Sequence, residues 1–246
     1  MGKKIAIQAQ LWDNANLEND FTPIFNEILE AGYDGVECRF TVMKQKSKLK
    51  DYLKDHSLTL LGLHAHPSVF IENGELKNEF YSLLHDMKEF HIPFLLVSGH
   101  PTPTEEAQLS LVKSLSILAD ECQKNNIQLV YHNHDFEFAN GYELFDRIID
   151  NQNIGIALDI GWLYRANYPL DEFISKYTNQ IKYFHIKDTT KKEWKELGTG
   201  TVDIVKAIAT IESIAMEWWT VEQDNSVLPP FESANKSREF LTKLGY

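Results

Sequence analysis

Short apolar runs alternate with amphipathic segments along the whole chain. The apolar runs predict eight strands, at residues 5–8, 35–38, 58–64, 94–98, 128–132, 154–159, 181–186 and 219–222. Between them, apolar residues recur at helical spacing, as in "FTPIFNEILEAG" and "EEAQLSLVKSLSILADECQKNN". Strands joined by helical crossovers run parallel, so eight such units in 246 residues predict an α/β fold, a closed (β/α)8 TIM barrel.

No Pro/Gly/Ser-rich linker or break in composition divides the chain. Residues 1–246 are therefore predicted to form a single (β/α)8 barrel domain. An open, doubly wound sheet is the alternative, but it would carry a glycine-rich GxGxxG turn after the first strand, where "QAQLWDNAN" stands instead. The barrel is the favoured fold.

The predicted strands place metal-ligand residues at one end of the barrel, where the functional groups of such folds lie. Strands five and six end in His132 and Asp159, strand seven contains His185, and strand eight ends in Glu222. Taken singly, Asp159 is also explained as a helix N-cap and His185 as a core histidine. Mixed imidazole and carboxylate ligands suit Mn, Co, Zn or Fe, with Mg a further candidate. We therefore predict that these four residues bind one divalent cation.

Composition narrows the class of partner. A net charge of -12 disfavours a nucleic-acid partner, because such partners are bound through clustered Lys and Arg. The two cysteines give no disulfide framework, the N-terminus shows no signal-peptide core, and no apolar run is long enough to span a membrane. We expect a soluble, cytoplasmic protein with a small-molecule partner, and homo-oligomerisation stays open.

Several segments resemble a known family. The segments "YHNHDFEF", "LDIGWLYRANYPLDEFISKY", "YFHIKD", "LGTGTVDIVKAI" and "VEQD" are similar to the sugar phosphate isomerase/epimerase group of the xylose-isomerase-like TIM barrels, and the likeness covers nearly the whole chain. The resemblance implies a divalent cation at the ends of strands five to eight, at positions that Asp159, His185 and Glu222 match. It implies activities such as ketose 3-epimerase, hydroxypyruvate isomerase or inosose dehydratase.

Strand five departs from the family pattern. The resemblance implies a glutamate there, as a metal ligand and as one of two proton-transfer carboxylates, but this strand ends in His132. Either Glu137 folds back to replace it, or His132 binds the metal while Glu137 transfers protons, or His134 is the ligand. We expect His132 to bind the metal, with Glu137 and Glu222 as the catalytic carboxylates.

These residue types support chemistry next to a carbonyl. A dication polarises a carbonyl and stabilises an enediolate, while a carboxylate removes the adjacent proton. We therefore expect an isomerase or epimerase acting on a sugar or keto-sugar, phosphorylated or not. The alternatives are a dehydratase of the inosose dehydratase type and a non-catalytic carbohydrate-binding barrel. An apurinic-site nuclease is disfavoured, because Trp162 stands where it would have a metal-binding histidine.

Further residues at the strand ends are candidates for substrate contact. The polar candidates are His64, His66, His100 and Glu37, and the aromatic candidates for stacking on a sugar ring are Trp12 and Trp162. Lys187 is a candidate for binding an oxyanion or a hydroxyl group. In a regular strand we expect Asp188 to share the face of His185, so Lys187 would reach inward from the strand end or form a salt bridge with Asp188 or Glu196. The turn "LGTGTVD" could cradle a phosphate.

Overall fold

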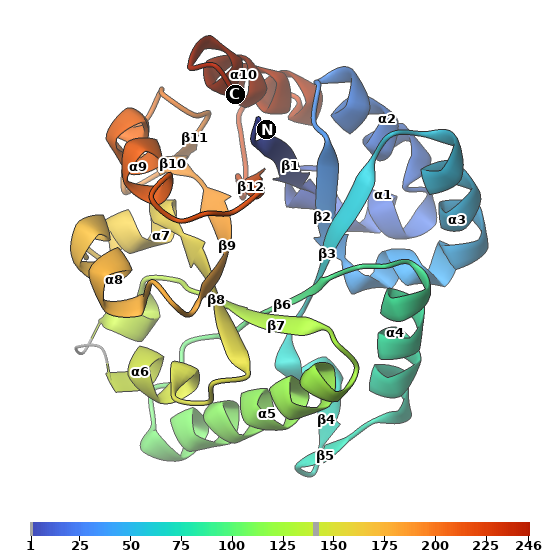
Figure 1. Ribbon diagram of the computed structural model, residues 1–246, viewed down its shortest axis with the longest axis vertical. Helices are drawn as coiled ribbons and strands as arrows, with labels where there is room; N and C mark the ends of the chain where they lie inside the picture. The colour runs from blue at the N-terminus through green and yellow to red at the C-terminus, as the bar shows by residue number, and fades with distance from the viewer. Residues whose placement is uncertain (1, 140–142) are drawn as a thin grey trace.

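The computed structural model describes residues 2–139 and 143–246. Eight parallel strands close into a barrel in the order β1-β12-β9-β8-β7-β6-β3-β2 (Figure 1). Their bounds are β1 Lys4–Gln8, β2 Gly35–Arg39, β3 Thr59–Ala65, β6 Phe94–Ser98, β7 Gln128–His132, β8 Ile154–Asp159, β9 Ile181–Ile186 and β12 Trp218–Val221. All eight predicted strands and the predicted fold are confirmed.

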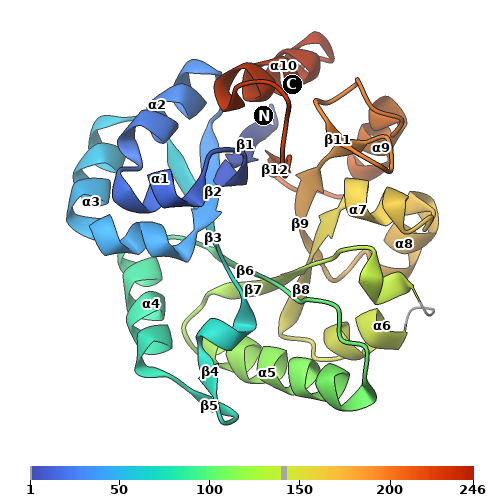
Figure 2. The same ribbon diagram turned by 180° about the vertical axis from the view of Figure 1, so that it is seen from behind.

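Helices surround the barrel in a ring, which is seen from the other side in Figure 2. Their bounds are α1 Asn14–Asn19, α2 Thr22–Glu30, α3 Lys46–Asp55, α4 Asn78–Glu89, α5 Glu105–Lys124, α6 Glu143–Ile149, α7 Ile160–Arg165, α8 Leu170–Tyr177, α9 Ile204–Ile211 and α10 Pro230–Lys243. The 3-10 turns are η1 Ala9–Leu11, η2 Phe40–Gln45, η3 Pro67–Val69 and η4 Phe136–Phe138. Two antiparallel ribbons complete the fold, β4 Ile71–Glu72 with β5 Glu75–Leu76, and β10 Asp188–Thr189 with β11 Trp194–Lys195.

Helix α5 shows how the sequence sets these elements. Thr104 caps its first turn by accepting a hydrogen bond from the Ala107 N–H at 3.2 Å, and Glu105 lies in that turn, where a negative charge favours the helix dipole. Leu111, Leu115, Leu118, Ala119 and Cys122 recur at helical spacing and are buried. This face packs against β7, which the helix precedes in the chain.

The strands divide the core into two layers. On β7, Leu129 and Tyr131 pack in the outer layer beneath the helices, whereas Val130 belongs to the interior cluster. This alternation gives every strand an inward and an outward face. His132, two residues beyond Val130, therefore faces the barrel interior.

Two bulges adjust this alternation. The β2–β3 register passes from Val36 opposite Leu60 to Glu37 opposite Gly62, so β3 carries one extra residue. Gly62 faces the packed interior, because an added Cβ would come 2.4 Å from a Leu96 methyl group. His64, two residues further along, consequently points into the barrel. A second shift adds one residue to β9 before Tyr183.

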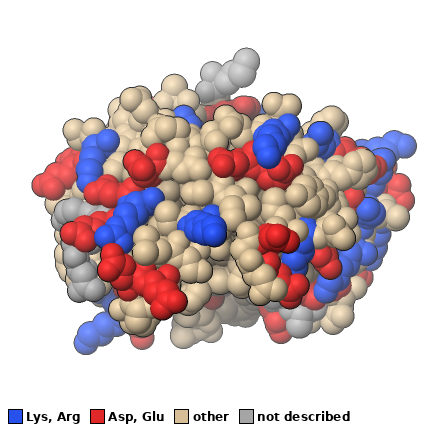
Figure 3. Space-filling model, turned by 90° about the horizontal axis from the view of Figure 1, so that it is seen from below, with Lys and Arg blue, Asp and Glu red and all other residues tan. Residues whose placement is uncertain are grey.

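The surface carries mixed charge. Acidic and basic side chains are intermingled on the face shown in Figure 3. Within the described part of the chain, no helix is long and apolar enough to cross a membrane.

Candidate metal centre and substrate pocket

A layer of polar side chains lies at the carboxyl end of the barrel interior. Below it lies the apolar interior cluster of Ala6, Leu61, Leu96, Val130, Ala157 and Tyr183. Strand alternation then places one polar residue of each strand above that cluster. These residues are Gln8, Glu37, His64, Ser98, His132, Asp159, His185 and Glu222.

Four of these side chains form a compact cluster. His132, Asp159, His185 and Glu222 are buried, and each places one ligand atom within 4.8 Å of the others. His132 Nε2 lies 3.2 Å from Asp159 Oδ2, and His185 Nδ1 lies 3.1 Å from Glu222 Oε2. The structure therefore brings together the four residues predicted as metal ligands.

Two buried ligand atoms without a hydrogen bond and a negative net charge make this cluster suitable for binding a divalent cation. His185 Nδ1 and Glu222 Oε2 are buried and make no hydrogen bond within the part of the chain that the structure describes. Lys187 lies among three carboxylates, those of Asp159, Glu222 and Asp224, which leaves a net charge of -2 from three negative groups and one positive group. The two imidazoles and two carboxylates of the cluster suit Mn, Co, Zn or Fe better than Mg.

Asp159 is both a helix N-cap and a member of the cluster, two roles that the sequence presented as alternatives. Its Oδ1 accepts a hydrogen bond from the Trp162 N–H at 2.8 Å and so caps α7. Its Oδ2 lies in the cluster, 3.6 Å from Lys187 Nζ. The cap fixes the carboxylate in one orientation and presents the second oxygen to the barrel axis.

Glu37 orients His185. The Glu37 carboxylate lies 2.6 Å from His185 Nε2, which turns Nδ1 toward Glu222. A carboxylate behind a ligating histidine commonly fixes its tautomer. Although burial disfavours a charged imidazole, the Glu37 and Glu222 carboxylates raise the pKa of His185 to about 9. Glu37 was expected to contact substrate, but its second oxygen also faces a histidine, His64, at 3.6 Å.

The imidazoles of His132 and His64 are expected to be uncharged. Burial lowers the pKa of each imidazole well below its usual value, and neutral imidazole is the form that binds a metal. Their rings lie 5.8 Å apart, and His64 Nε2 lies 3.2 Å from Ser98 Oγ. His64 thus lies beside the cluster, and its contact with a substrate stays a prediction.

Lys187 points into the cluster, which reverses the orientation expected for it and Asp188. Its ammonium lies 2.7 Å from Asp224 Oδ1, 3.3 Å from Glu222 Oε1 and 3.6 Å from Asp159 Oδ2. The physical reason is strand alternation, since His185 and Lys187 are two residues apart and share the inward face. Of the two alternatives for Lys187, the structure has the inward one, with ion pairs to Asp159, Glu222 and Asp224 in place of Asp188 or Glu196. Although burial opposes the charged form, the neighbouring carboxylates raise the pKa of Lys187 above its usual value.

An aromatic wall stands beside Lys187. Its ammonium lies 4.1 Å from the centre of the Trp194 ring and 5.3 Å from that of Trp162, both within cation–π range. Arg165 lies over the same two rings, and His134 lies 4.9 Å from Trp162. Trp162 therefore lies beside Lys187, and its stacking on a sugar ring stays a prediction.

His66 and His100 lie just beyond the carboxyl ends of β3 and β6, outside the metal-ligand cluster. Their ring nitrogens Nε2 and Nδ1 are 2.9 Å apart. Both line a cavity of about 560 Å³ between the loop after β3 and helix α5. They remain candidates for contact with an extended part of a substrate.

Two predicted residues lie away from the cluster. The Trp12 indole N–H donates to Glu27 Oε2 on α2 at 2.6 Å, so this side chain packs in the outer layer. Both Glu137 carboxylate oxygens accept hydrogen bonds, from the Tyr131 hydroxyl at 2.6 Å and from the His134 N–H at 2.8 Å. Tyr131 faces the outer layer, so this placement argues against the expected proton-transfer role of Glu137.

The "LGTGTVD" turn binds a carboxylate of the protein itself. The N–H groups of Gly198, Gly200 and Val202 donate to the Asp188 carboxylate at 3.0, 2.9 and 3.2 Å. A Cβ at Gly200 would lie 2.2 Å from Asp188 Oδ1, so only glycine fits this close approach. The predicted phosphate cradle is wrong, because Asp188 already occupies these donors.

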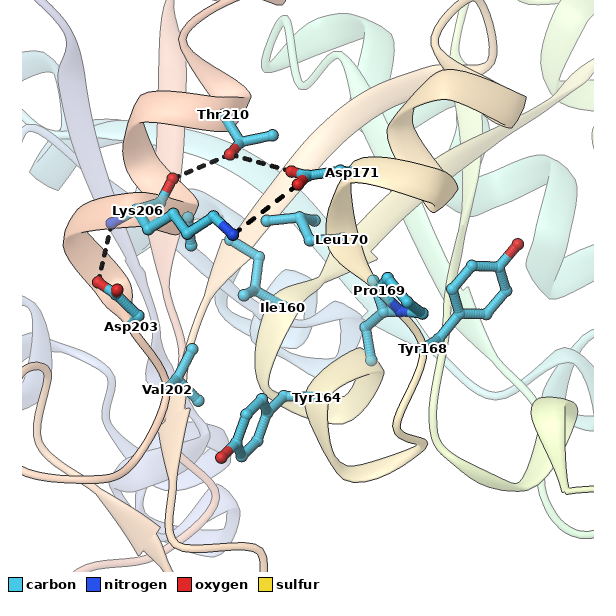
Figure 4. Close-up of a pocket in the computed structure, with 12 residues that line it drawn as sticks. Ile160, Tyr164, Tyr168, Pro169, Leu170, Asp171, Val202, Asp203, Lys206 and Thr210 are labelled. Carbon is cyan, nitrogen blue, oxygen red and sulfur yellow. Dashed lines mark hydrogen bonds and ion pairs between the residues drawn. The ribbon is translucent and has the colours of Figure 1, made fainter.

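A separate cavity of about 240 Å³ lies between α7, α8 and α9 (Figure 4). At its rim, Asp171 contacts the Thr210 hydroxyl at 3.3 Å and Lys206 Nζ at 3.9 Å. Apolar side chains such as Ile160 and Leu170 line the interior. None of its lining residues belongs to the metal-ligand cluster, so this cavity is not part of the site.

Sequence comparison agrees with the barrel and its cluster. The profile of the family described as xylose isomerase-like TIM barrel matches residues 25–244. The chain belongs to this family. Its membership agrees with a closed barrel whose functional side chains lie at the carboxyl ends of the strands.

Proteins similar to this xylose isomerase-like barrel have names that describe several different activities. An inosose dehydratase of Clostridium perfringens is 23% identical and aligns over 97% of this chain and 96% of its own length. A sugar phosphate isomerase/epimerase from Parabacteroides distasonis has a TM-score of 0.80 at 17% identity, covering 98% of each chain. The IolI protein with a bound zinc atom has a TM-score of 0.74 at 19% identity, covering 98% of this chain and 97% of its own. At these identities the two structures establish the fold alone.

Three residues of the site were not predicted from the sequence. The position of Asp224 could have been predicted, because it stands two residues after Glu222 and so continues the inward face. Arg165 lies on the short helix α7, and Trp194 lies on the ribbon strand β11. Neither has a periodic pattern that would place it against Lys187.

Proposed function

We propose that the protein is a divalent-cation-dependent enzyme that removes a proton next to the carbonyl group of a small sugar or keto-polyol. The observation that carries this proposal is the buried convergence of His132, Asp159, His185 and Glu222. The bound cation would polarise the carbonyl oxygen and stabilise negative charge on it.

The chain's own groups would divide the proton chemistry. Glu222 offers Oε2 to the cation site, while Oε1 faces Lys187 and is the proposed base. Lys187 is held as an ammonium by its carboxylate neighbours and would stabilise charge that develops on a substrate oxygen. His134 is half-buried, and its ring lies 4.9 Å from that of His132, where it could return a proton.

Loss of water is the leading reaction. Removing the proton beside a carbonyl and expelling a hydroxyl group from the next carbon needs one base and one acid, which Glu222 and His134 would supply. The near-complete alignment with an inosose dehydratase supports this choice. Epimerisation or isomerisation is the second candidate, supported by the structural likeness to a sugar phosphate isomerase/epimerase.

Solvent deuterium separates these reactions. The Mn-loaded protein is incubated in D2O with an inosose and, separately, with a panel of ketoses, and the products are analysed by NMR and mass spectrometry. Loss of one water identifies the dehydratase, whereas deuterium in a product of unchanged formula identifies the epimerase or isomerase. Glu222→Gln should abolish either outcome, and the control Glu217→Gln, at an exposed salt bridge, should not. Turnover without solvent exchange or water loss would refute the proposed proton chemistry.

A further inference from the structure

Arg39, at the end of β2, has no ion-pair partner among the residues that the structure describes. The sequence has four arginines, and the other three, Arg147, Arg165 and Arg238, each have an acidic or carbonyl partner. Arg39 makes neither an ion pair nor a hydrogen bond with the residues that the structure describes, and its Nε is buried without a partner. A partly buried guanidinium without an acceptor is unfavourable, so a missing partner is expected.

Strand geometry places Arg39 at the mouth of the site. It is two residues after Glu37 and so shares the inward face, roughly 6.6 Å further along the strand. It stands opposite His64 in the β2–β3 register. The Glu37 carboxylate below it contacts His185 at 2.6 Å, so Arg39 lies one layer above the metal-ligand cluster.

The groups around Arg39 do not neutralise it. The Glu37 carboxylate is already engaged by His185 and faces His64. Glu18 is near enough to be influenced by Arg39, but it is paired with Lys44 at 3.0 Å. His64 and His66 have pKa values lowered by burial and bring no negative charge.

We propose that Arg39 binds an oxyanion of the substrate, a phosphate ester or a carboxylate carried several bonds from the reacting carbonyl. The planar guanidinium matches both anions through two parallel hydrogen bonds. This inference rests on the proposed function, because it takes the cluster as the place where the carbonyl binds. It narrows the substrate class from sugars in general to acidic or phosphorylated ones.

Binding of polyols that cannot react tests Arg39 without requiring turnover. Sorbitol 6-phosphate, gluconate and sorbitol are titrated calorimetrically into the Mn-loaded wild type, Arg39→Gln, Arg39→Lys and the control Arg147→Gln. At least one of the two anions should bind the wild type roughly tenfold to a hundredfold more tightly than sorbitol does, as for hydrogen bonds between charged groups. The preferred anion then distinguishes a phosphate from a carboxylate.

The variants show whether Arg39 itself binds the anion or whether the protein attracts anions non-specifically. Arg39→Gln should lose the preference, Arg39→Lys should keep part of it, and Arg147→Gln should keep all of it. Equal binding of the three polyols by the wild type, or an anion preference that survives in Arg39→Gln, overturns the proposal. Melting temperature and Mn content, measured for each variant, show whether the barrel is intact. If no ketose or inosose is turned over, whether neutral, acidic or phosphorylated, the proposed function fails, while these titrations still decide the role of Arg39.

Discussion

Replacing Lys187 by methionine should destabilise the metal-free protein and strengthen metal binding at the same time. The Lys187 ammonium is fully buried and lies within 3.6 Å of three carboxylates. Methionine has a similar length but leaves these carboxylates without their cation. Removing one partner of a buried ion pair typically costs about 3–5 kcal/mol. We expect a loss of about 4 kcal/mol in the free energy of unfolding at pH 7.

A divalent cation should recover part of this loss. The cation would neutralise Asp159 and Glu222, the two carboxylates that Lys187 shares with the cluster. If the loss falls from about 4 to about 2 kcal/mol at saturating Mn, linkage requires that the variant bind Mn roughly thirtyfold more tightly than the wild type. Turnover should nevertheless fall, because the group proposed to stabilise developing charge is gone. Stability and metal affinity are thus linked through one thermodynamic cycle, and each measurement checks the other.

Acid should reduce the destabilisation of the metal-free variant. Burial raises the pKa of Asp159, although Lys187 counteracts this, so removing Lys187 should raise it further. A buried carboxylate whose pKa is raised on folding destabilises the protein above that pKa and ceases to do so as the pH falls through it. The difference between variant and wild type should therefore shrink as the pH falls through the raised pKa of Asp159 toward the usual pKa of an aspartate.

Urea unfolding followed by the fluorescence of the five tryptophans measures these differences, with and without Mn after chelator treatment. Lys182→Met is the control, since Lys182 is an exposed lysine on β9, the strand that Lys187 follows, and it should change stability by less than about 0.5 kcal/mol. A loss below about 1 kcal/mol in metal-free Lys187→Met, together with unchanged Mn affinity, would refute the electrostatic role of Lys187.

Four further substitutions test the site and the residues that support it. Asp159→Ala and Glu222→Gln should each lower Mn occupancy after purification without chelator, and full occupancy in elemental analysis of both would show that the cluster is misassigned. Gly200→Ala should cost about 1–3 kcal/mol in urea unfolding, because its Cβ would overlap the Asp188 carboxylate, whereas Gly2→Ala should cost nothing measurable. Glu137→Gln should lower the free energy of unfolding by about 1–2 kcal/mol, because it weakens the hydrogen bond from the Tyr131 hydroxyl. Its turnover should stay within about threefold of the wild type. A loss of turnover of about a hundredfold at normal metal content would show that Glu137 takes part in the mechanism after all.

The sequence was sufficient for the eight strands and the four-residue cluster because both depend on local pattern. Apolar runs mark strands, and parallel topology brings their carboxyl ends to one mouth. The cluster needed only the last polar residue of four strands, His132, Asp159, His185 and Glu222, and no precise side-chain geometry.

The orientation of single side chains was harder to predict. Lys187 and Asp188 were assigned to the wrong faces, although counting two residues from His185 is sufficient to place them. Glu137 was misplaced for another reason, because the buried hydroxyl that it satisfies belongs to Tyr131, and nothing in the sequence shows which buried donor lacks an acceptor. Trp194 reaches the site only through the fold of a ribbon outside the barrel.

His132 changes the charge balance of the site rather than its geometry. Its pKa is lowered well below the usual range by burial, so it adds no charge to Asp159 and Glu222. With Lys187 and Asp224 included, the charge is -2 before a dication binds and zero afterwards, apart from the ligand His185 and the Glu37 carboxylate behind it. A glutamate at this position would leave an additional negative charge and an oxygen-richer ligand set, which suits Mg. In the proposed function the histidine would therefore favour a softer ion such as Zn, Co or Fe, and it would leave proton transfer to Glu222 and to groups that do not bind the metal.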